Sequence, residues 1–484
     1  MKRLIVWMWS LLGAVAALAQ PGYKIDIEVK GFGGNQALLA YYYGDKQYVK
    51  DTVPVSNGSF SFSGDEALDG GMYLVVLPPK NNYFELVIDK DQHFSLATDT
   101  ADFVRNMKIK GSKDNELFYQ DLIYIATKRK EAQDLQARIQ TAGKGSAEAK
   151  PLEEALDRLN EEVMASRAAF IKNNPDALYA KLLLAVEEPE IPEQPLRADG
   201  SPVDSLFAFK YYRGHYFDNV DFGDARLIRT PVLNQKATQY VDKLTYRHPD
   251  SINVALDYII GKARANDDVF QFFVIHFLNK YAQSKVMGYD AIYVHLVEKY
   301  YMSGDAWWVD SATIAKMTER AISISPTLIG RRASDFFVQD VDGRQQHPYG
   351  IGADYLILYF WDYDCGHCKK ITPQLAKSFA RYQGRSVKLF TVSINGDVET
   401  WKKKLGEYGL VQEQVINCQD HRRLSGFDGM YDIRSTPRIF LIDKDKKIMA
   451  KQISVDQLDE ILSRELGMEP PAELHGPVVE EDEH

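Results

Sequence analysis

The chain has 484 residues, of which 45% are hydrophobic and 26% are charged, and its formal net charge is −10. This length exceeds what one hydrophobic core usually supports, so we expect two or three domains. The hydrophobic share excludes a disordered chain, and the negative charge argues against a nucleic-acid partner because phosphate binding needs a basic surface.

The first nineteen residues have the pattern of a secretory signal peptide. Lys2 and Arg3 form a basic start, residues 4–16 form an apolar run, and a small-x-small motif ends at Ala19. The apolar run is shorter than a membrane span, and no cysteine for lipid attachment lies near the cleavage site. The sequence therefore predicts an exported protein, periplasmic or secreted, that is cleaved near Ala19.

Residues 20–112 have the pattern of short β-strands. Residues 23–29 alternate between apolar and polar side chains, as a half-buried strand does. Glycine, proline and Asn-Gly turn signals separate further runs of this kind. These runs cover residues 37–43, 59–63, 72–77, 84–88 and 93–97. Their number and spacing predict an N-terminal antiparallel β-sandwich-like domain.

Residues 113–328 are predicted to form a helical middle domain. From residue 113 the apolar period becomes that of a helix, and Phe118, Leu122 and Ile125 share one face. A glycine-rich turn is expected at residues 142–146 and a proline-rich loop at 187–202.

Residues 329–467 alternate between strand and helix patterns. The predicted strands are 336–341, 355–361, 387–394, 415–418, 439–443 and 448–453. The predicted helices are 366–382, 398–407, 420–431 and 455–466. This alternation predicts an α/β domain with helices on both faces of a central sheet, followed by an acidic disordered tail over residues 468–484. The fold class is thus multidomain α+β.

The three cysteines all lie after residue 360, and two of them form a Cys-x-x-Cys pair. Cys365 follows an apolar strand and begins a helix, where unpaired N–H groups and the helix dipole favour a thiolate. We therefore expect Cys365 to be the nucleophile and Cys368, one turn further, to resolve the mixed disulfide and to pair with Cys365. Gly366 and His367 between them are expected to tune the redox potential, and Cys418 is the remaining thiol.

Two carboxylates lie directly before this pair. Asp362 and Asp364 are expected to raise the pKa of Cys365, which opposes His367 and the helix start. The sequence therefore leaves the direction of electron flow open, with a reductase and an isomerase or oxidant both possible outcomes.

The segment around the pair resembles the active site of thioredoxin-fold proteins. Residues 359–361 followed by residues 365–369, Cys-Gly-His-Cys-Lys, carry the resemblance, and the Cys-Gly-His-Cys core is similar to that of protein disulfide isomerases. Residues 435–437, Ser-Thr-Pro, before the apolar strand 439–443 resemble the cis-proline element of this fold. An extra helix and strand at 398–418 resemble the insertion of TlpA- and ResA-type extracytoplasmic thioredoxins.

The resemblance implies a thiol-disulfide oxidoreductase that acts on protein thiols and disulfides without a bound cofactor. It implies that Thr436 and Pro437 hold the substrate backbone and that a membrane-embedded electron donor recycles the pair. Three positions depart from the family pattern, one of which is Asp364, directly before the pair, where the family often has tryptophan. Tyr359 stands where many thioredoxins have a buried acid, and Ile371 stands where ResA-like proteins have a glutamate.

Other interpretations of the cysteines stay open. Cys365 and Cys368 could join Cys418 and His421 in a zinc site, although 49 residues separate the two halves of this ligand set. A thioredoxin-fold peroxidase would have a threonine at position 362, and a Sco-type copper-delivery protein would have three residues between its cysteines. A scaffold or binding protein with a vestigial redox pair is the alternative from a different class.

Overall fold

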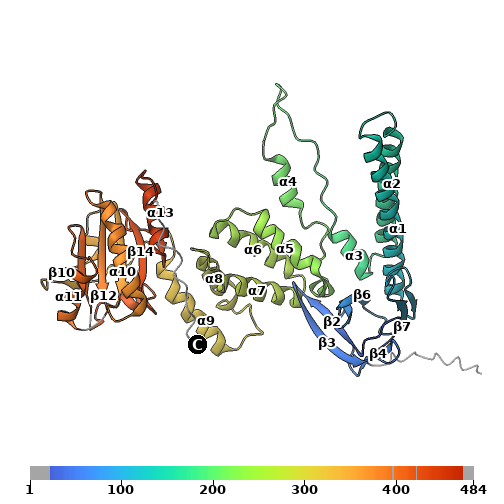
Figure 1. Ribbon diagram of the computed structural model, residues 1–484, viewed down its shortest axis with the longest axis horizontal. Helices are drawn as coiled ribbons and strands as arrows, with labels where there is room; N and C mark the ends of the chain where they lie inside the picture. Colours follow the sequence, from blue (N-terminus) through green and yellow to red (C-terminus); the bar gives the residue numbers. More distant parts are fainter. Residues whose placement is uncertain (1–21, 395–396, 421, 472–484) are drawn as a thin grey trace, which may run out of the picture. The chain divides into compact units, whose positions relative to one another are not determined.

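The computed structural model describes residues 22–394, 397–420 and 422–471 (Figure 1). The predicted signal peptide lies outside these residues, as does the acidic tail beyond residue 471. The chain divides into two compact units. One runs to Thr245 and includes Ile259–Phe272, and the other comprises Tyr246–Tyr258 and the chain from Phe273 onward. No helix within the described ranges combines the length and apolar character needed to cross a membrane.

Two four-stranded sheets form the β-rich part of the first unit. One has the order β4-β1-β7-β8 and the other β3-β2-β5-β6. The strands are β1 Tyr23–Lys30, β2 Gln36–Tyr43, β3 Lys46–Pro54, β4 Ser59–Gly64, β5 Gly71–Leu77, β6 Asn82–Ile88, β7 His93–Asp99 and β8 Lys108–Lys110. Alternate residues of β1 are buried and exposed along its whole length, which explains why the sequence pattern found this strand.

The β-rich part differs from the sequence prediction in two ways. Strands β3 and β8 were not predicted, because β3 is exposed over most of its length and β8 has only three residues. The pairing is also not wholly antiparallel, because β1 and β7 run parallel from Lys24 beside His93 to Lys30 beside Asp99.

Helices follow the sheets in the first unit. Helix α1 begins after Ser112, whose side chain accepts a hydrogen bond from the N–H of Asn115 and so caps the helix. Helices α1 and α2 lie side by side as an antiparallel pair (Figure 1), joined by the predicted turn at Gly143. The elements are α1 Lys113–Ala142, α2 Lys150–Asn173, α3 Leu178–Ala185, α4 Phe207–His215, the 3-10 helix η1 Ala225–Arg229 and α5 Pro231–Lys243.

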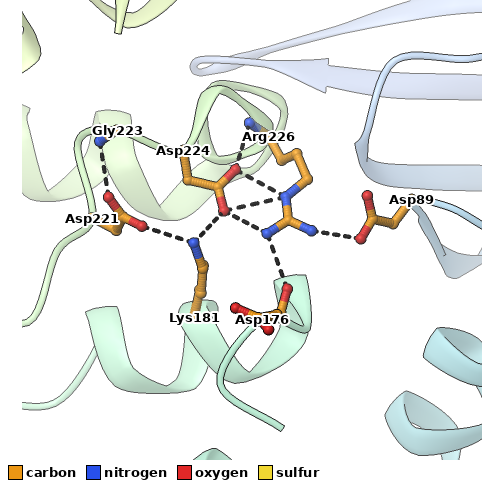
Figure 2. A network of polar contacts seen from close by, with 7 residues as sticks. All are labelled: Asp89, Asp176, Lys181, Asp221, Gly223, Asp224 and Arg226. Atoms are coloured by element: carbon orange, nitrogen blue, oxygen red, sulfur yellow. Dashed lines mark hydrogen bonds and ion pairs between the residues drawn. The ribbon is translucent and has the colours of Figure 1, made fainter. Parts of the chain in front are cut away.

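A network of charged groups joins the helices to the sheets within this unit (Figure 2). The Arg226 guanidinium binds both carboxylate oxygens of Asp224 and also Asp89, which follows β6. Lys181 of α3 lies 2.7 Å from Asp221 and 2.9 Å from Asp224. Burial raises the pKa of Asp224, but Arg226 and Lys181 outweigh burial and lower the pKa to about 2.

Further helices lead to the C-terminal sheet. The chain continues through α6 Pro249–Ala263, α7 Asp267–Ala282, α8 Asp290–Leu296, the π-helical turn η2 Val297–Tyr301, α9 Ser311–Ile324 and the 3-10 turn η3 Ser325–Thr327. After η3 the backbone runs beside strand β15. The N–H of Gly330 donates to Ile448, the N–H of Ile448 donates to Arg331, and the N–H of Ala333 donates to Lys446.

A seven-stranded sheet of order β10-β9-β13-β12-β11-β14-β15 forms the C-terminal part. Its strands are β9 Val338–Asp340, β10 Gln345–Gln346, β11 Tyr355–Trp361, β12 Val387–Ser393, β13 Val415–Gln419, β14 Arg438–Asp443 and β15 Ile448–Lys451. Its helices are α10 Gly366–Phe379, α11 Val398–Glu407, α12 Phe427–Met430 and α13 Val455–Glu465, with the 3-10 turns η4 Pro348–Gly350 and η5 Ala380–Tyr382. The parallel strands β11, β12 and β13 end at the same edge of the sheet.

Each face of this sheet has its own hydrophobic core. Ile357, Tyr359 and Trp361 of β11 pack with α10, α11 and α13 on one face. The alternate residues Leu358 and Phe360 pack with the α12 region and the segment after η3 on the other. The predicted multidomain α+β fold class, with a β-rich N-terminal part, a helical middle and a C-terminal α/β part, is confirmed.

The helix predicted at residues 420–431 is mostly wrong, because α12 covers only Phe427–Met430. The Asp420 carboxylate accepts hydrogen bonds from the N–H groups of Leu424 and Ser425, which replaces helical pairing by a loop. Gly426 adopts a φ of 72°, a left-handed conformation that ends the loop before α12 begins.

Candidate active site at the start of helix α10

The Cys-x-x-Cys pair lies where a buried strand meets a helix. Strand β11 ends at Trp361, and Cys365 is the N-cap residue of α10, with an extended backbone conformation. The cap places Cys365 beside the first N–H groups of the helix, which have no partner within the helix itself. The predicted strand-to-helix position of the pair therefore agrees with the described geometry.

The Cys365 thiol is partly exposed and has an environment that favours its thiolate. Burial raises the pKa of this thiol, but the backbone N–H groups of Cys368 and His367 and the side chains of Cys368 and Thr436 lower it. The lowering effects outweigh burial, so the pKa of Cys365 lies below the ordinary value for cysteine. The thiol also lies 3.4 Å from the Thr436 carbonyl oxygen, to which it donates.

Cys368 differs from Cys365 in every one of these respects. Its side chain is fully buried in the core beneath α10, and burial raises the pKa of its thiol to about 12. The N–H of Asp362 donates to the Cys368 sulfur over 3.4 Å. This hydrogen bond and the Thr436 side chain offset only part of the rise in pKa that burial causes. Both cysteines are free thiols in the structure, which corresponds to the reduced pair.

The segment with Thr436 and Pro437 lies beside Cys365, and its role in holding a substrate backbone stays a prediction. The peptide bond between these two residues is cis. The Thr436 carbonyl oxygen lies 3.4 Å from the Cys365 sulfur, and the Thr436 side chain lowers the pKa of both thiols. The segment directly precedes strand β14, which pairs antiparallel with β11 and so brings Thr436 to the strand end from which Cys365 emerges.

The two residues between the cysteines are exposed at the helix start. Gly366 has open space where a side chain would be, and the His367 ring is exposed. The His367 backbone, through its N–H, is the part of this residue that lowers the pKa of Cys365. The tuning roles of Gly366 and His367 stay predictions.

Asp362 and Asp364, directly before the pair, are joined by a hydrogen bond within the turn that leads to Cys365. The Asp362 carboxylate accepts a hydrogen bond from the N–H of Asp364 over 2.8 Å. The sequence left the net shift in the pKa of Cys365 open; burial raises this pKa, but the N–H groups of the helix start and the side chains of Cys368 and Thr436 outweigh burial, and the net shift is downward.

Tyr359 fills the position where the resemblance implied a buried acid. Its hydroxyl lies 2.8 Å from the Thr372 hydroxyl, and both groups are buried. Thr372 lies one helical turn after Cys368, and sequence reasoning missed it although the spacing of four residues places it on the same face of α10. The hydroxyl of Tyr363, also missed, accepts from the N–H of Asp397 over 3.2 Å and ties the loop before Cys365 to the start of α11.

Cys418 lies apart from the redox pair. It is fully buried in β13 and belongs to the core on the face of the sheet opposite to Cys368. Burial, followed by Asp340, raises the pKa of its thiol well above the ordinary range. Zinc ligands must all lie within about 2.3 Å of one ion, so cysteines on opposite faces do not suit the zinc hypothesis. Of its proposed ligands, His421 lies outside the described residues.

Three family models match separate parts of the chain. A thioredoxin-like family matches residues 352–448, and domains of unknown function DUF4369 and DUF5106 match residues 23–118 and 148–323. The thiol-disulfide oxidoreductase ResA of Bacillus thuringiensis is 27% identical over 134 residues, which cover 28% of this chain and 74% of ResA.

Solved structures with similarity to the chain include two from bacteria. A thioredoxin-like protein from Bacteroides caccae is 19% identical, with a TM-score of 0.41 over 58% of this chain and 99% of that protein. A domain of a possible thiol-disulfide isomerase from Cytophaga hutchinsonii is 30% identical, with a TM-score of 0.28 over 30% of this chain and 96% of that domain.

The site geometry and the family matches concern the same residues, which include the Cys-x-x-Cys pair and the cis-proline. The C-terminal part of the chain is therefore a thioredoxin-like domain with similarity to thiol-disulfide oxidoreductases, and it follows DUF4369 and DUF5106 regions.

Proposed function

We propose that this protein is an exported thiol-disulfide oxidoreductase that exchanges disulfides with protein partners through Cys365 and Cys368. The observation that carries this proposal is the contrast between the two thiols. Cys365 is accessible and has a lowered pKa, whereas Cys368 is buried and has a pKa raised to about 12. This contrast supports a nucleophile and a resolving thiol. The signal-peptide pattern of the first nineteen residues supports export to the periplasm or the cell exterior.

In the first step, the Cys365 thiolate attacks one sulfur of a partner disulfide. The S–S bond of the partner breaks as the bond from Cys365 to the attacked sulfur forms, and the other partner sulfur leaves as a thiolate that takes up a proton. The N–H groups of Cys368 and His367 stabilise the attacking thiolate before this step. In this proposal Thr436 and Pro437 hold the partner backbone beside the sulfur, and the 3.4 Å distance from the Cys365 sulfur to the Thr436 carbonyl oxygen supports this role.

In the second step, Cys368 loses its proton and attacks the sulfur of Cys365. The mixed disulfide breaks as the Cys365–Cys368 disulfide forms. The partner leaves reduced, with two thiols. Two electrons pass from this protein to the partner, so a dithiol protein must reduce the pair again. We propose a membrane-embedded donor for that role. In the reverse direction the same steps transfer a disulfide to a partner dithiol.

Insulin-disulfide reduction with dithiothreitol as electron source tests this function. The purified wild-type protein should accelerate insulin precipitation, and Cys365→Ser should abolish the acceleration because the nucleophile is gone. Cys418→Ala, which removes the buried thiol on the other face of the sheet, should keep it. Equal rates for wild type and Cys365→Ser would instead support a scaffold with a vestigial redox site.

The reduction potential of the pair decides between the two directions. A value near that of thioredoxin, about −270 mV, indicates a reductase, and a value near that of protein disulfide isomerase, about −180 mV, indicates an oxidant or isomerase. Titration against glutathione buffers, followed by mass spectrometry of the Cys365–Cys368 peptide, measures it.

A further inference from the structure

A buried carboxylate lies at the start of the segment that leads to Thr436. The Asp432 side chain is only 4% exposed and has no helix or strand to hold it, because it follows α12 in a left-handed conformation with a φ of 51°. A buried carboxylate is costly unless charged or polar groups surround it. The groups that surround Asp432 therefore determine where this segment can lie.

Two of these groups come from helix α9, more than a hundred residues earlier in the chain. Arg320 Nη1 and Ser323 Oγ each lie 2.6 Å from the Asp432 carboxylate. The two residues are three positions apart, so they share one face of α9. Arg434 Nε is the third donor, at 2.9 Å. Burial raises the pKa of Asp432, but Ser323, Arg434 and Arg320 outweigh it and lower the pKa, so the carboxylate is charged.

Helix α9 is itself fastened to the thioredoxin-like domain. The buried amine of Lys451, in strand β15, donates to the Thr327 hydroxyl over 3.1 Å, directly after α9 ends. The same amine forms an ion pair with Asp290 at the start of α8. Helix α9 is thus held at its C-terminal end as well as through Arg320, and it presents a fixed surface to Asp432.

The path from Asp432 to the redox site is short. Four residue steps lead from Asp432 to Thr436, and four steps span at most about 14 Å of extended chain. The N–H of Ile433 is bonded to the Asp428 carbonyl over 2.9 Å, which fixes the first step. At the other end the Thr436 carbonyl accepts from the Cys365 thiol over 3.4 Å. A displacement of Asp432 would therefore move Thr436 relative to Cys365.

We propose that helix α9 positions the redox site, because Arg320 and Ser323 hold Asp432 and thereby hold Thr436 against Cys365. This inference rests on the proposed function of the pair and adds a role for the DUF5106 region, whose match ends at residue 323. Arg320, Ser323 and Asp432 are positioning residues, since none of them contacts a sulfur in this network. The helical region then acts on the chemistry of the thioredoxin-like domain through one buried carboxylate.

The test uses the full-length double variant Arg320→Met/Ser323→Ala, which leaves the thioredoxin-like domain unchanged. The Thr436 side chain lowers the pKa of Cys365, so displacement of this residue should raise that pKa. Alkylation of Cys365 by iodoacetamide at neutral pH should slow by about threefold, which corresponds to a pKa rise of about half a unit. The whole pH profile should move to higher pH, and Arg320→Lys, which keeps the charge, should move it less.

Lys316→Met is the matched control. Lys316 is exposed on α9, one turn before Arg320, and its loss removes a charge of the same sign. Its alkylation profile should equal that of the wild type. A wild-type profile in the folded double variant would overturn the inference. If the double variant does not fold, Ser323→Ala alone is measured. A smaller shift of its alkylation profile to higher pH supports the inference, and an unshifted profile overturns it.

The outcome stays distinct from that of the proposed function. Alkylation measures the Cys365 thiolate without any turnover, whereas insulin reduction by the wild type tests the exchange reaction. An active wild type with an unshifted double variant would contradict only the positioning role. An inactive wild type with a shifted double variant would contradict only the proposed function.

Discussion

The Cys365 thiol is partly exposed at the start of α10, whereas the Cys368 thiol is enclosed beneath the same helix. Desolvation acts on both sulfurs, but the helix N–H groups compensate for it only at Cys365. The two thiols lie only three positions apart in the sequence but differ strongly in acidity, which is the physical basis for assigning them different roles.

This difference predicts an order of alkylation in the reduced protein. Cys365 should react first, with a rate that rises with pH through a pKa below 9, because a lowered pKa means that the thiolate forms at lower pH. Cys368 should stay unreactive until the pH approaches about 12 or the protein unfolds. Peptide mass spectrometry after timed iodoacetamide treatment measures both rates, and Cys418 is the buried internal control. Faster labelling of Cys368 than of Cys365 would contradict the assignment.

A second buried carboxylate, Asp459 of α13, predicts a stability effect. Its oxygen accepts hydrogen bonds from the hydroxyls of Ser378 and Tyr382, and all three side chains are buried. Asp459→Ala removes this buried acceptor from both hydroxyls, so it should lower the free energy of unfolding by about 1–3 kcal/mol. Urea unfolding measures the change. Glu460→Ala, at an exposed position of the same helix, should have no such effect.

Site residues could be predicted from the sequence only where the residues that determine their role lie nearby in the chain. The Cys365–Cys368 spacing and the strand before it were visible, and the resemblance supplied Thr436 and Pro437. The positioning role of Asp432 could not be predicted from the sequence, because its partners Arg320 and Ser323 are 112 and 109 positions away. Neither hydrophobic periodicity nor a sequence motif shows that residues so far apart in the chain are in contact.

At the scale of elements, helix α13 illustrates how a local motif fixes a boundary. The Ser454 hydroxyl accepts from the N–H of Gln457, and the Gln457 side chain accepts from the N–H of Ser454. This capping box starts the helix that covers one face of the sheet beside α10.

Ser454→Ala should therefore lower the free energy of unfolding of the chain by about 1 kcal/mol, because two N–H groups at the helix start lose their fixed partners. Ser454→Thr keeps the hydroxyl and is the matched control. Chemical unfolding curves of the two variants measure the difference. Equal stability of Ser454→Ala and Ser454→Thr would show that the box does not contribute.

Elements were predictable where one face is buried and the other exposed, as in β1 and in α11, whose bounds match the prediction. Strand β3 was missed because it is largely exposed and carries no alternation. The long helix predicted at 420–431 was wrong because the Asp420 side chain competes for backbone N–H groups. A hydrogen bond from a nearby side chain to the backbone is a local effect that the hydrophobic periodicity of the sequence does not reveal.

At the scale of the whole molecule, the Arg226 network joins strands and helices of the first unit. Arg226→Met leaves the Asp224 and Asp89 carboxylates without this partner, and we expect a loss of about 2 kcal/mol in the free energy of unfolding. Arg229→Met is the control, because its partner Asp69 is exposed and such pairs contribute about 0–1 kcal/mol. Thermal unfolding at fixed pH compares the two variants, and equal losses would contradict the expectation.

The same network predicts a pH dependence. Asp224 has a pKa lowered to about 2, against about 3.9 in an unfolded chain. A lowered carboxylate pKa gives stability that is present above pH 4 and is lost as the pH falls toward 2. The melting temperature of the wild type should fall over this window. Asp224→Asn should already be less stable at pH 7 and should show a shallower fall.

The sequence predicted the α+β class and the order of β-rich, helical and thioredoxin-like parts, because each part has its own hydrophobic period. The domain boundaries at residues 112, 328 and 467 stay predictions. The ion pairs and hydrogen bonds of Arg226, Lys181 and Lys451 could not be predicted, because nothing in the sequence distinguishes these residues from charged residues on the surface.

The backbone hydrogen bonds from residues 330–333 to β15 have a consequence for solubility. Strand β15 is the last strand of the seven-stranded sheet, and an uncovered edge offers its N–H and C=O groups to other chains. Gly330 and Arg331 occupy the N–H and C=O of Ile448, the first residue of β15, and Ala333 bonds the Lys446 carbonyl just before it. The stretch that connects the helices to the thioredoxin-like domain therefore also acts as a guard against edge-to-edge aggregation, which a chain shortened to begin at residue 334 would lack.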